Sequence, residues 1–308
     1  VMAIVNRAPS GPINIHTDHS DSMNVRDAGW IQLYTEDAQE AYDTTIQAFK
    51  IAERHDVLLP VMVMLDGFLI SHTLQNVYLL PDEAVREFLG GPRKPPKIKL
   101  FGREVELALK TLAMGQPVPV TMGPLDLWDY YFEHKRQQFE AFKNAKKAIK
   151  EVNEEYAKIS GRKYGNGLVH PFWTEDADIV VACMGSTAGT VRHVLRELRK
   201  EGEKIGLLRI RSFRPFPYED VMEHLSGAKA VIVFDRSVDM GAQGAPLFVE
   251  IRSALYDLDE RPFVYDYVYG LGGRDMPPHL IREVFEEVLE VARTGEVEPA
   301  LRFKGVRE

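Results

Sequence analysis

The chain contains a single cysteine, Cys183, among its 308 residues. One cysteine excludes a disulfide framework within the chain, and it excludes a zinc or iron–sulfur site built from the cysteines of this chain alone. Cys183 ends an apolar run that starts at Ile179, where a free thiol behaves as a small core residue. The cysteine usage therefore predicts a reducing, cytoplasmic setting and no metal site in this chain.

Long apolar runs and an excess of positive charge are also missing. No stretch reaches the roughly 20 consecutive apolar residues of a membrane helix, and no signal-peptide pattern is visible. The formal net charge is −8 and the sequence pI is about 5.7, a sign that opposes binding to phosphate backbones and anionic lipids. We therefore expect a soluble protein without a nucleic-acid or membrane partner.

The first five residues are apolar and predict a buried strand. No capping residue or turn precedes them, and a free terminus is rarely the first residue of a central strand. We therefore expect that the chain begins inside a domain whose earlier part precedes residue 1.

The apolar periodicity predicts an α/β fold. Residues 36–54 have helical spacing, and the run 57–65 is apolar on both faces, as in strands of a parallel sheet that is covered by helices. Together with the strand over 1–5 they form a βαβ unit. The prolines between residues 81 and 124 predict an extended connecting arm with a short helix near 103–113.

The second half of the chain repeats the alternation of strand and helix. A long helix is predicted over 126–159, with Gly161 as its stop. Beyond residue 165 the pattern is doubly wound. The predicted strands are 178–183, 204–210, 229–234 and 262–268, and the predicted helices are 188–200, 243–257 and 278–293. The predicted division of the chain is therefore 1–82, 83–164 and 165–308.

Polar residues follow the predicted strands. Arg7 comes directly after the first strand, where an arginine faces the crevice that binds ligands in parallel sheets and can pair bidentately with a carboxylate. A structural salt bridge is the alternative, and the residue type alone leaves both open. The loop from His16 to Asp21 matches no common zinc or calcium spacing. It predicts a cleft-lining loop with Asp18 and His19 as candidate ligand contacts.

Three turns have two interpretations each. The segment from Gly185 to Thr190 follows a strand and opens a helix, as a phosphate loop does, but it lacks the lysine of a Walker motif and the third glycine of a dinucleotide fingerprint. A tight turn is favoured there and at Gly270–Asp275. At the third turn we expect Asp66 to cap the turn and Gly67 to adopt a positive φ.

Several of these segments carry a family likeness. They resemble the α subunits of the 2-oxoacid:ferredoxin oxidoreductase family, of the pyruvate type, and the match runs in order through both halves of the chain. The segments are Asn6–Ile15, Asp18–Asp21, Arg26–Gln32, Gln39–Ala41, Leu58–Val61, Asp66–Phe68, Ser71–Thr73, Met184–Thr190, Arg214–Pro217 and Gly270–Asp275.

The resemblance implies a fold and a set of partners. Residues 1–82 look like the C-terminal part of the pyrimidine-binding domain of thiamine-diphosphate enzymes, and 165–308 look like a transketolase C-terminal-type domain. Thiamine diphosphate and its Mg²⁺ would be shared with a β subunit. The [4Fe–4S] clusters would lie in partner subunits, in a complex with β, γ and δ-type chains. The electrons would pass to ferredoxin, and coenzyme A would take the acyl group.

By the same resemblance Arg7 is the arginine that binds the substrate carboxylate, which would orient the oxoacid and offset its charge before CO₂ leaves. Two departures limit the match. The family's upstream glutamate and threonine cannot be mapped onto this sequence. Pro9 and Gly11 stand where the pyruvate enzymes usually have larger or less rigid residues. Other 2-oxoacids or oxalate therefore stay open as substrates. A non-catalytic structural subunit and a transketolase-like ketol transferase stay open as alternative functions.

Overall fold

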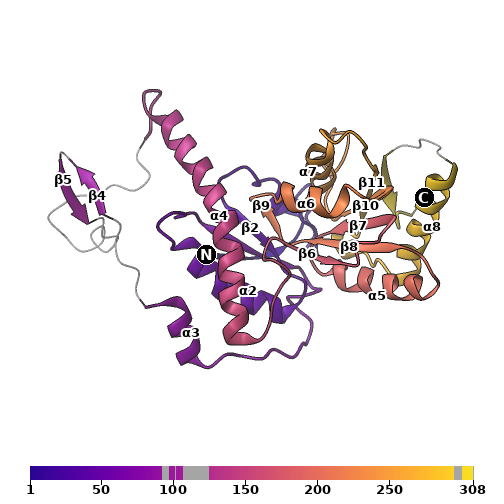
Figure 1. The fold of residues 1–308 in the computed structure, drawn as a ribbon, viewed down its shortest axis with the longest axis horizontal. Helices are drawn as coiled ribbons and strands as arrows, with labels where there is room; N and C mark the ends of the chain where they lie inside the picture. Colours follow the sequence, from indigo (N-terminus) through magenta and orange to yellow (C-terminus); the bar gives the residue numbers. More distant parts are fainter. Residues whose placement is uncertain (92–96, 101, 107–124, 295–299, 308) are drawn as a thin grey trace.

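The computed structural model describes residues 1–91, 97–100, 102–106, 125–294 and 300–307. Its two main sheets are mostly parallel and lie side by side (Figure 1). The first has four strands in the order β1-β3-β2-β9, and the second has six in the order β12-β11-β10-β7-β8-β6. The predicted α/β class is confirmed. Within the described ranges, no helix is both long enough and apolar enough to cross a bilayer.

The first sheet brings two candidate segments together. Strands β1 (Met2–Asn6), β3 (Val61–Asp66) and β2 (Ile31–Tyr34) are parallel, and β9 (Ser212–Arg214) joins β2 in antiparallel fashion from the second half of the chain. Asn6 pairs with Asp66 in the register of β1 and β3. The chain therefore leaves the sheet at neighbouring points, at Arg7 and at Gly67.

Helices α2 (Ala38–Ala52) and α4 (Tyr131–Ser160) cover one face of this sheet. Asp37 caps α2 by accepting a hydrogen bond from the Glu40 amide, as the acidic helix start favours. The α4 helix ends at Gly161 with a φ of 69°, which confirms the predicted stop. The helix begins five residues later than predicted, because residues 128–130 form a turn.

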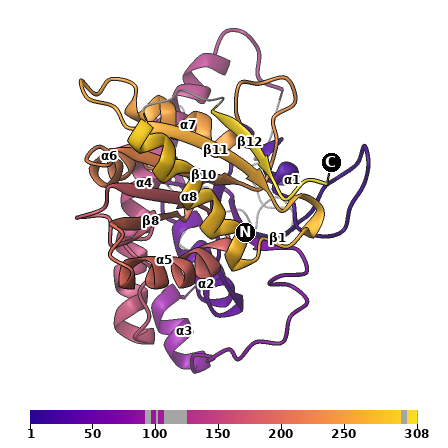
Figure 2. The same cartoon turned by 90° about the vertical axis from the view of Figure 1, so that its right-hand side faces the viewer.

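The second sheet has helices on both faces. Helices α6 and α7 lie on one side of its strands and α5 on the other (Figure 1), and Figure 2 shows β8, β10, β11 and β12 in succession. Cys183 is fully buried in this sheet, which confirms its predicted core position. The elements are β6 (Val169–Phe172), β7 (Ile179–Cys183), α5 (Thr187–Lys200), β8 (Ile205–Ile210), α6 (Tyr218–Leu225), β10 (Ala230–Asp235), α7 (Pro246–Leu255), β11 (Phe263–Tyr269), α8 (Pro278–Thr294) and β12 (Leu301–Lys304).

Three predictions were wrong. The β1 strand is an edge strand with exposed side chains, Val5 among them at 45%, rather than a buried strand. Part of the expected extended arm is the helix α3 (Asp82–Leu89), which ends at Gly90 in the left-handed conformation. Residues 103–106 form the strand β5 (Arg103–Glu106), paired with β4 (Lys97–Leu100), in place of the expected helix. The rest of that predicted helix, 107–113, lies outside the described residues.

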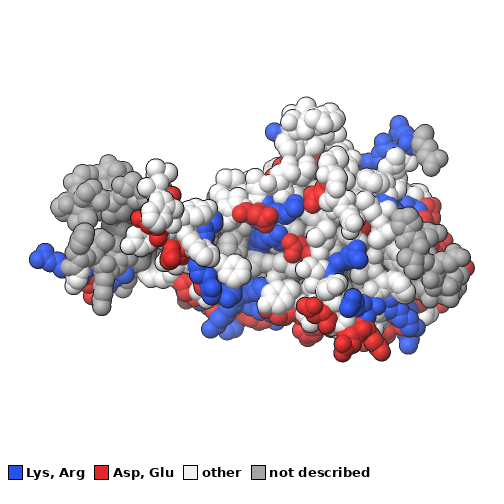
Figure 3. Space-filling model, turned by 90° about the horizontal axis from the view of Figure 1, so that it is seen from above, with Lys and Arg blue, Asp and Glu red and all other residues white. Residues whose placement is uncertain are grey.

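Acidic and basic side chains are mixed on the surface. Lys146 and Lys150 of α4 form ion pairs with Glu219 and Asp220 of α6. Figure 3 shows lysine and arginine side chains beside acidic ones on one face of the molecule. Lys146 and Lys150 are therefore paired with acidic residues of the second half of the chain and do not form a free basic patch.

Buried charges join the two sheets. Arg209 at the end of β8 and Arg211 just after it are 1% and 2% exposed, and both bind the carboxylate of Glu40 on α2, which is 1% exposed. Arg211 Nε lies 2.6 Å from Glu40 Oε1. Burial opposes ionisation of Glu40, but the two guanidinium groups hold its pKa below the usual range.

Substituting Glu40 with alanine would leave the buried guanidinium of Arg211 without its counter-charge, and it would leave Arg209 with Glu36 alone, whose Oε2 lies 3.3 Å from Arg209 Nη1. We expect Glu40→Ala to lower the free energy of unfolding by about 3–5 kcal/mol, since breaking a buried pair strands the remaining charge. Urea unfolding followed by circular dichroism measures the loss. Glu201→Ala, which breaks the exposed pair with Arg282, is the matched control and should change stability far less. Equal losses in the two variants would contradict this account.

Two carboxyl groups lie at the beginning of α7. Asp235 accepts hydrogen bonds from the amides of Leu247 and Phe248, and Asp266 accepts one from Ala245 at 2.7 Å. Burial raises the pKa of Asp266 to about 7, and burial together with the charge of Asp266 raises the pKa of Asp235. The folded state therefore retains a proton here that the unfolded chain releases near pH 4.

The raised pKa predicts a stability that falls with pH. Between about pH 4 and pH 7 the folded protein binds more protons than the unfolded chain, so the free energy of unfolding decreases as pH rises through this range. Asp266→Asn should reduce this decline, because an amide stays neutral and Asp235 alone is left to titrate. Its melting temperature relative to wild type should be higher at pH 8 than at pH 5. The exposed Asp257→Asn is the control, and melting curves that stay parallel at both pH values would refute the assignment.

Candidate active site

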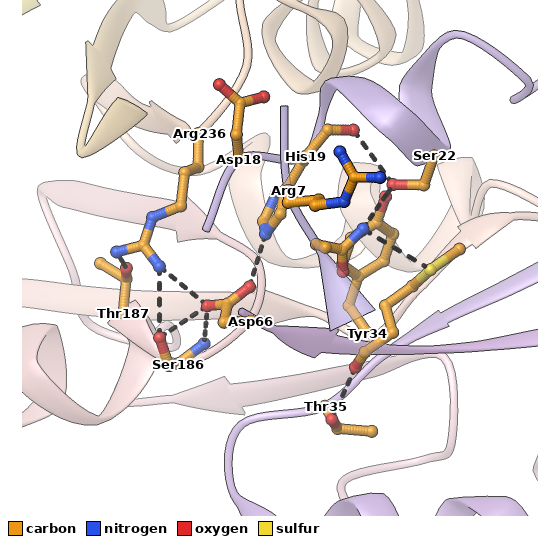
Figure 4. A network of polar contacts seen from close by, with 12 residues as sticks. Arg7, Asp18, His19, Ser22, Tyr34, Thr35, Asp66, Ser186, Thr187 and Arg236 are labelled. Atoms are coloured by element: carbon orange, nitrogen blue, oxygen red, sulfur yellow. Dashed lines mark hydrogen bonds and ion pairs between the residues drawn. The ribbon is translucent and has the colours of Figure 1, made fainter. Parts of the chain in front are cut away.

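The candidate site lies where β1 and β3 end. Arg7 follows β1, Asp66 ends β3, and the short helix α1 (Ser20–Met23) packs against β1 with His19 at its start. Residues from the second sheet approach the same place, namely Ser186 at the beginning of α5 and Arg236 just after β10. Figure 4 shows this network.

Asp66 is the centre of the network. Its carboxylate is 1% exposed, with Oδ1 2.7 Å from His19 Nε2 and Oδ2 2.9 Å from Arg236 Nη1. Oδ2 also accepts hydrogen bonds from the Ser186 amide at 2.9 Å and the Ser186 hydroxyl at 2.6 Å. Burial alone would favour the neutral acid, but Arg236, His19 and Ser186 hold the pKa of Asp66 well below its usual range. Asp66 is therefore an ionised junction between the two sheets rather than the turn cap expected from the sequence.

The turn at residues 185–187 is explained by the same junction. Gly185 has a φ of 66°, and a Cβ there would lie 2.7 Å from Asp66 Oδ2. The first amide of α5 binds the Asp66 carboxylate, so the anion at this helix start belongs to the protein itself. This contact favours the tight turn over the phosphate loop.

Arg236 is a site residue that sequence reasoning missed. It is 4% exposed, its Nη2 donates to Thr187 Oγ1 at 2.9 Å, and its guanidinium lies 4.9 Å from the centroid of the Tyr269 ring. Gly270 keeps the space beside it open, since a Cβ there would lie 3.1 Å from Arg236 Nε. The available signal was its position after a strand, the same signal that identified Arg7.

Arg7 is exposed at the end of β1. Its guanidinium donates weakly to the carbonyls of Ala8 at 3.2 Å and Pro9 at 3.5 Å, and it forms no ion pair within the described part of the chain. Its backbone amide donates to Asp21 Oδ2 at 3.0 Å. The side chain is therefore available to bind an anion, and the structural salt bridge considered from the sequence is not formed among the described residues.

The two other predicted contacts differ from each other. His19 is 1% exposed and uses Nε2 for Asp66, while its buried Nδ1 has no hydrogen-bond partner among the described residues. Asp18 accepts a hydrogen bond from the Ser20 amide at 2.7 Å, and its carboxylate points away from Asp66 in Figure 4. The structure brings His19 into the network and leaves Asp18 beside it. Their role in cofactor binding stays a prediction.

The turn after β3 corrects one expectation. The positive φ belongs to Phe68, at 64°, and not to Gly67. Gly67 is needed for another reason, because a Cβ there would lie 2.4 Å from the Asn6 carbonyl oxygen. The Phe68 ring lies 4.3 Å from the rings of both His16 and His72. This three-ring stack braces the loop after β1 against the loop after β3.

The comparisons with known proteins are consistent with this geometry. Residues 1–154 match the family described as pyruvate flavodoxin/ferredoxin oxidoreductase, thiamine diphosphate-binding, and residues 177–281 match pyruvate:ferredoxin oxidoreductase core domain II. The pyruvate synthase subunit PorA of Thermotoga maritima is 49% identical over 308 residues, which cover all of this chain and 73% of that protein. The chain belongs to the 2-oxoacid:ferredoxin oxidoreductase family.

Other relatives agree with this membership. The ketoisovalerate oxidoreductase subunit VorA of Pyrococcus horikoshii is 37% identical over 98% of this chain and 72% of that protein. A solved structure of the 2-oxoglutarate:ferredoxin oxidoreductase of Magnetococcus marinus matches with a TM-score of 0.56 and 19% identity, over 93% of this chain and 48% of that one. That likeness shows the fold. The chain is an α-type subunit of such an enzyme, and its relatives work as parts of multi-subunit proteins.

Removing the charge of Asp66 should loosen both segments that the junction holds. In Asp66→Asn an amide N–H₂ group would face donors from Ser186 or Arg236, and a buried guanidinium would lose its counter-charge. We expect faster amide hydrogen exchange in residues 17–23 and 185–188, measured by mass spectrometry. Asp176→Asn, which alters the exposed pair with Arg199, is the control. Unchanged exchange in both segments would show that the junction is not structural.

Proposed function

We propose that this chain is the α subunit of a thiamine-diphosphate-dependent enzyme that decarboxylates pyruvate oxidatively to acetyl-CoA and CO₂ and passes the electrons to ferredoxin. The choice of pyruvate is supported by relatives named pyruvate synthase subunit PorA at 49% and 46% identity. The 37% relative named for ketoisovalerate supports a branched 2-oxoacid as the second candidate.

The observation that carries the proposal is the exposed guanidinium of Arg7 at the carboxyl end of a parallel strand, which forms no ion pair with any of the described residues. A 2-oxoacid presents a carboxylate next to its reacting carbonyl, and a guanidinium binds a carboxylate through two parallel hydrogen bonds. Arg7 would thereby hold the oxoacid in one orientation and offset its charge before CO₂ leaves.

The cofactor arrangement is part of the proposal. Thiamine diphosphate, when bound, supplies the carbon nucleophile that adds to the 2-oxo carbon. On this chain the buried Thr17 hydroxyl and His19 Nδ1 have no hydrogen-bond partner among the described residues, so they offer polar atoms in the loop that follows Arg7. We propose that Asp18 and His19 line the pyrimidine side of the cleft. The cofactor's Mg²⁺ would be held with the β subunit.

The remaining partners follow from the same assignment. The [4Fe–4S] clusters would lie in partner subunits, because this chain has one cysteine and it is buried. Subunits of β, γ and δ type, ferredoxin, coenzyme A and a cytoplasmic location complete the proposal. We also propose the division of the chain into the parts 1–82, 83–164 and 165–308. Strand β9 belongs to the third part in sequence but to the sheet of the first part in space.

Changing Arg7 in the reconstituted complex tests the proposal. We expect Arg7→Ala to raise KM and lower kcat for pyruvate, with kcat/KM reduced about 10- to 100-fold, the range of a lost charge-assisted hydrogen bond. Arg7→Lys should recover only part of this loss, because an ammonium group cannot form the two parallel bonds. Steady-state assays of ferredoxin reduction measure both variants.

The exposed Arg261→Ala serves as the control and should behave as wild type. Assays with pyruvate and 2-oxoisovalerate in parallel decide between the two substrates. Wild-type kinetics in Arg7→Ala with both acids would sink the assignment of Arg7. It would also favour the alternative in which this chain is a non-catalytic structural subunit.

A further inference from the structure

We infer that Asp21 is a positioning residue, which fixes the backbone from which the Arg7 side chain projects. The inference rests on the proposed function, in which Arg7 binds the carboxylate of the oxoacid. Asp21 would act on the substrate only through Arg7.

The β-ladder does not hold Arg7 itself. The paired residues of β1 and β3 end at Asn6 and Asp66, and the segment after Arg7 runs into a loop. The Arg7 amide is bound instead by Asp21, whose Oδ2 accepts its hydrogen at 3.0 Å. The same carboxylate accepts, through Oδ1, the Asn6 side-chain amide at 2.8 Å and the Ser22 backbone amide at 2.7 Å. One carboxylate therefore fixes the last residue of the strand and the first residue of the loop together.

This carboxylate is braced from a second strand. The Asn6 side-chain amide also reaches the Ser22 hydroxyl at 3.0 Å, and that hydroxyl lies 2.8 Å from the Tyr34 hydroxyl of β2. Asn6 and Ser22 are 0% and 2% exposed. A connected set of buried hydrogen bonds rigidifies the groups that it joins. Here the Asn6 side-chain N–H₂ group and the hydroxyls of Ser22 and Tyr34 are bonded, while Asn6 Oδ1 has no partner among the described residues. The position of the Arg7 backbone is thus tied to the interior of the first sheet.

The bond from Asp21 leaves the Arg7 side chain free. Asp21 binds the main chain of Arg7, and its contacts within the described residues do not include the guanidinium. A carboxylate that paired with the guanidinium would compete with the substrate. A carboxylate that holds only the amide reduces the backbone freedom lost on binding without such competition.

Asparagine is the sharpest substitution because it keeps the shape of aspartate. All three partners of Asp21 are N–H donors, so a carboxylate satisfies them and an amide cannot. In Asp21→Asn, the side-chain N–H₂ group must face at least one of these donors. The N–H₂ group is expected to face the Arg7 amide, because the opposite orientation would turn it toward two donors, those of Asn6 and Ser22. The backbone at Arg7 then loses a hydrogen bond while the guanidinium itself is unchanged.

The experiment uses the reconstituted complex with its partner subunits. We expect Asp21→Asn to raise KM for pyruvate about tenfold with a smaller change in kcat, since a lost hydrogen bond at a buried group has an effect of this order. KM for coenzyme A and the affinity for thiamine diphosphate should stay as in wild type. Asp21→Glu keeps the acceptor charge and should restore part of the loss. Asp27→Asn, at an exposed residue of the next turn, is the matched control.

The pH profile separates this role from a merely structural one. Burial raises the pKa of Asp21, and the titratable groups that face it are His19 at the start of α1 and Tyr34 on β2, while Arg7 faces it through its backbone amide. A protonated Asp21 offers one acceptor fewer, so KM of the wild type should rise as pH falls. In Asp21→Asn, KM should be high at every pH and lack this acid limb.

A double variant distinguishes failure of the inference from failure of the proposed function. If Asp21 acts through Arg7, Asp21→Asn should have no further effect on KM in the Arg7→Ala background. Impaired Arg7→Ala together with a wild-type KM in Asp21→Asn would overturn the inference alone. The same fold-change of Asp21→Asn in both backgrounds would also overturn it.

Unimpaired Arg7→Ala would overturn the proposed function and, with it, the role of Asp21. If Asp21→Asn does not assemble, a wild-type KM and pH profile in Asp21→Glu would overturn the inference, and a raised KM would support it.

Discussion

The arrangement of the site depends on the hydrogen bonds and ion pairs of one group, the ionised carboxylate of Asp66. It is buried, so its charge is stable only because Arg236, His19 and the first amide of α5 surround it. These partners come from both sheets. The loop after β1 and the start of α5 can therefore reach their positions only when the two sheets are in contact. The geometry of the site therefore depends on residues from both halves of the chain.

A second cluster of buried charges also joins the two sheets. Glu40 of α2 binds both Arg209 and Arg211, which come from the second half of the chain, and Glu36 is a second carboxylate partner of Arg209. Strand β9, which follows Arg211 directly in the sequence, pairs with β2 of the first sheet. Since an uncompensated charge in the interior is costly, both clusters favour one relative placement of the sheets. A rigid frame of this kind lets an exposed side chain such as Arg7 hold a defined position.

Much of the fold could be predicted from the sequence, because the strands of the second sheet are apolar on both faces and alternate with helices of clear periodicity. The failures have physical reasons. Strand β2 was not among the predicted strands. It contains Gln32 and Tyr34, whose polar groups form hydrogen bonds in the interior, so the strand does not stand out as an apolar run. Strand β9 has three residues and depends on a partner from the first half of the chain. In the site, Arg7 was found because its position after a strand is local information. Arg236 also follows a strand, but its burial and its partners Asp66 and Thr187, which are distant in sequence, cannot be read from that position.

The position of Phe68 shows what a pattern of residue types cannot convey. A glycine beside a strand end predicts a positive φ, yet here the bulky residue adopts it and the glycine gives room to the Asn6 carbonyl. A phenylalanine in this conformation is strained, and such strain persists only where surrounding contacts determine it. The contacts here are the rings of His16 and His72 and the hydrogen bond from the Phe68 amide to the Ser71 hydroxyl. The strained turn, the ring stack and the Asp21 carboxylate act on the same few residues at the ends of β1 and β3. Chemistry on an anion at this edge would require that the backbone does not yield when the ligand binds, and these three features together restrict its movement.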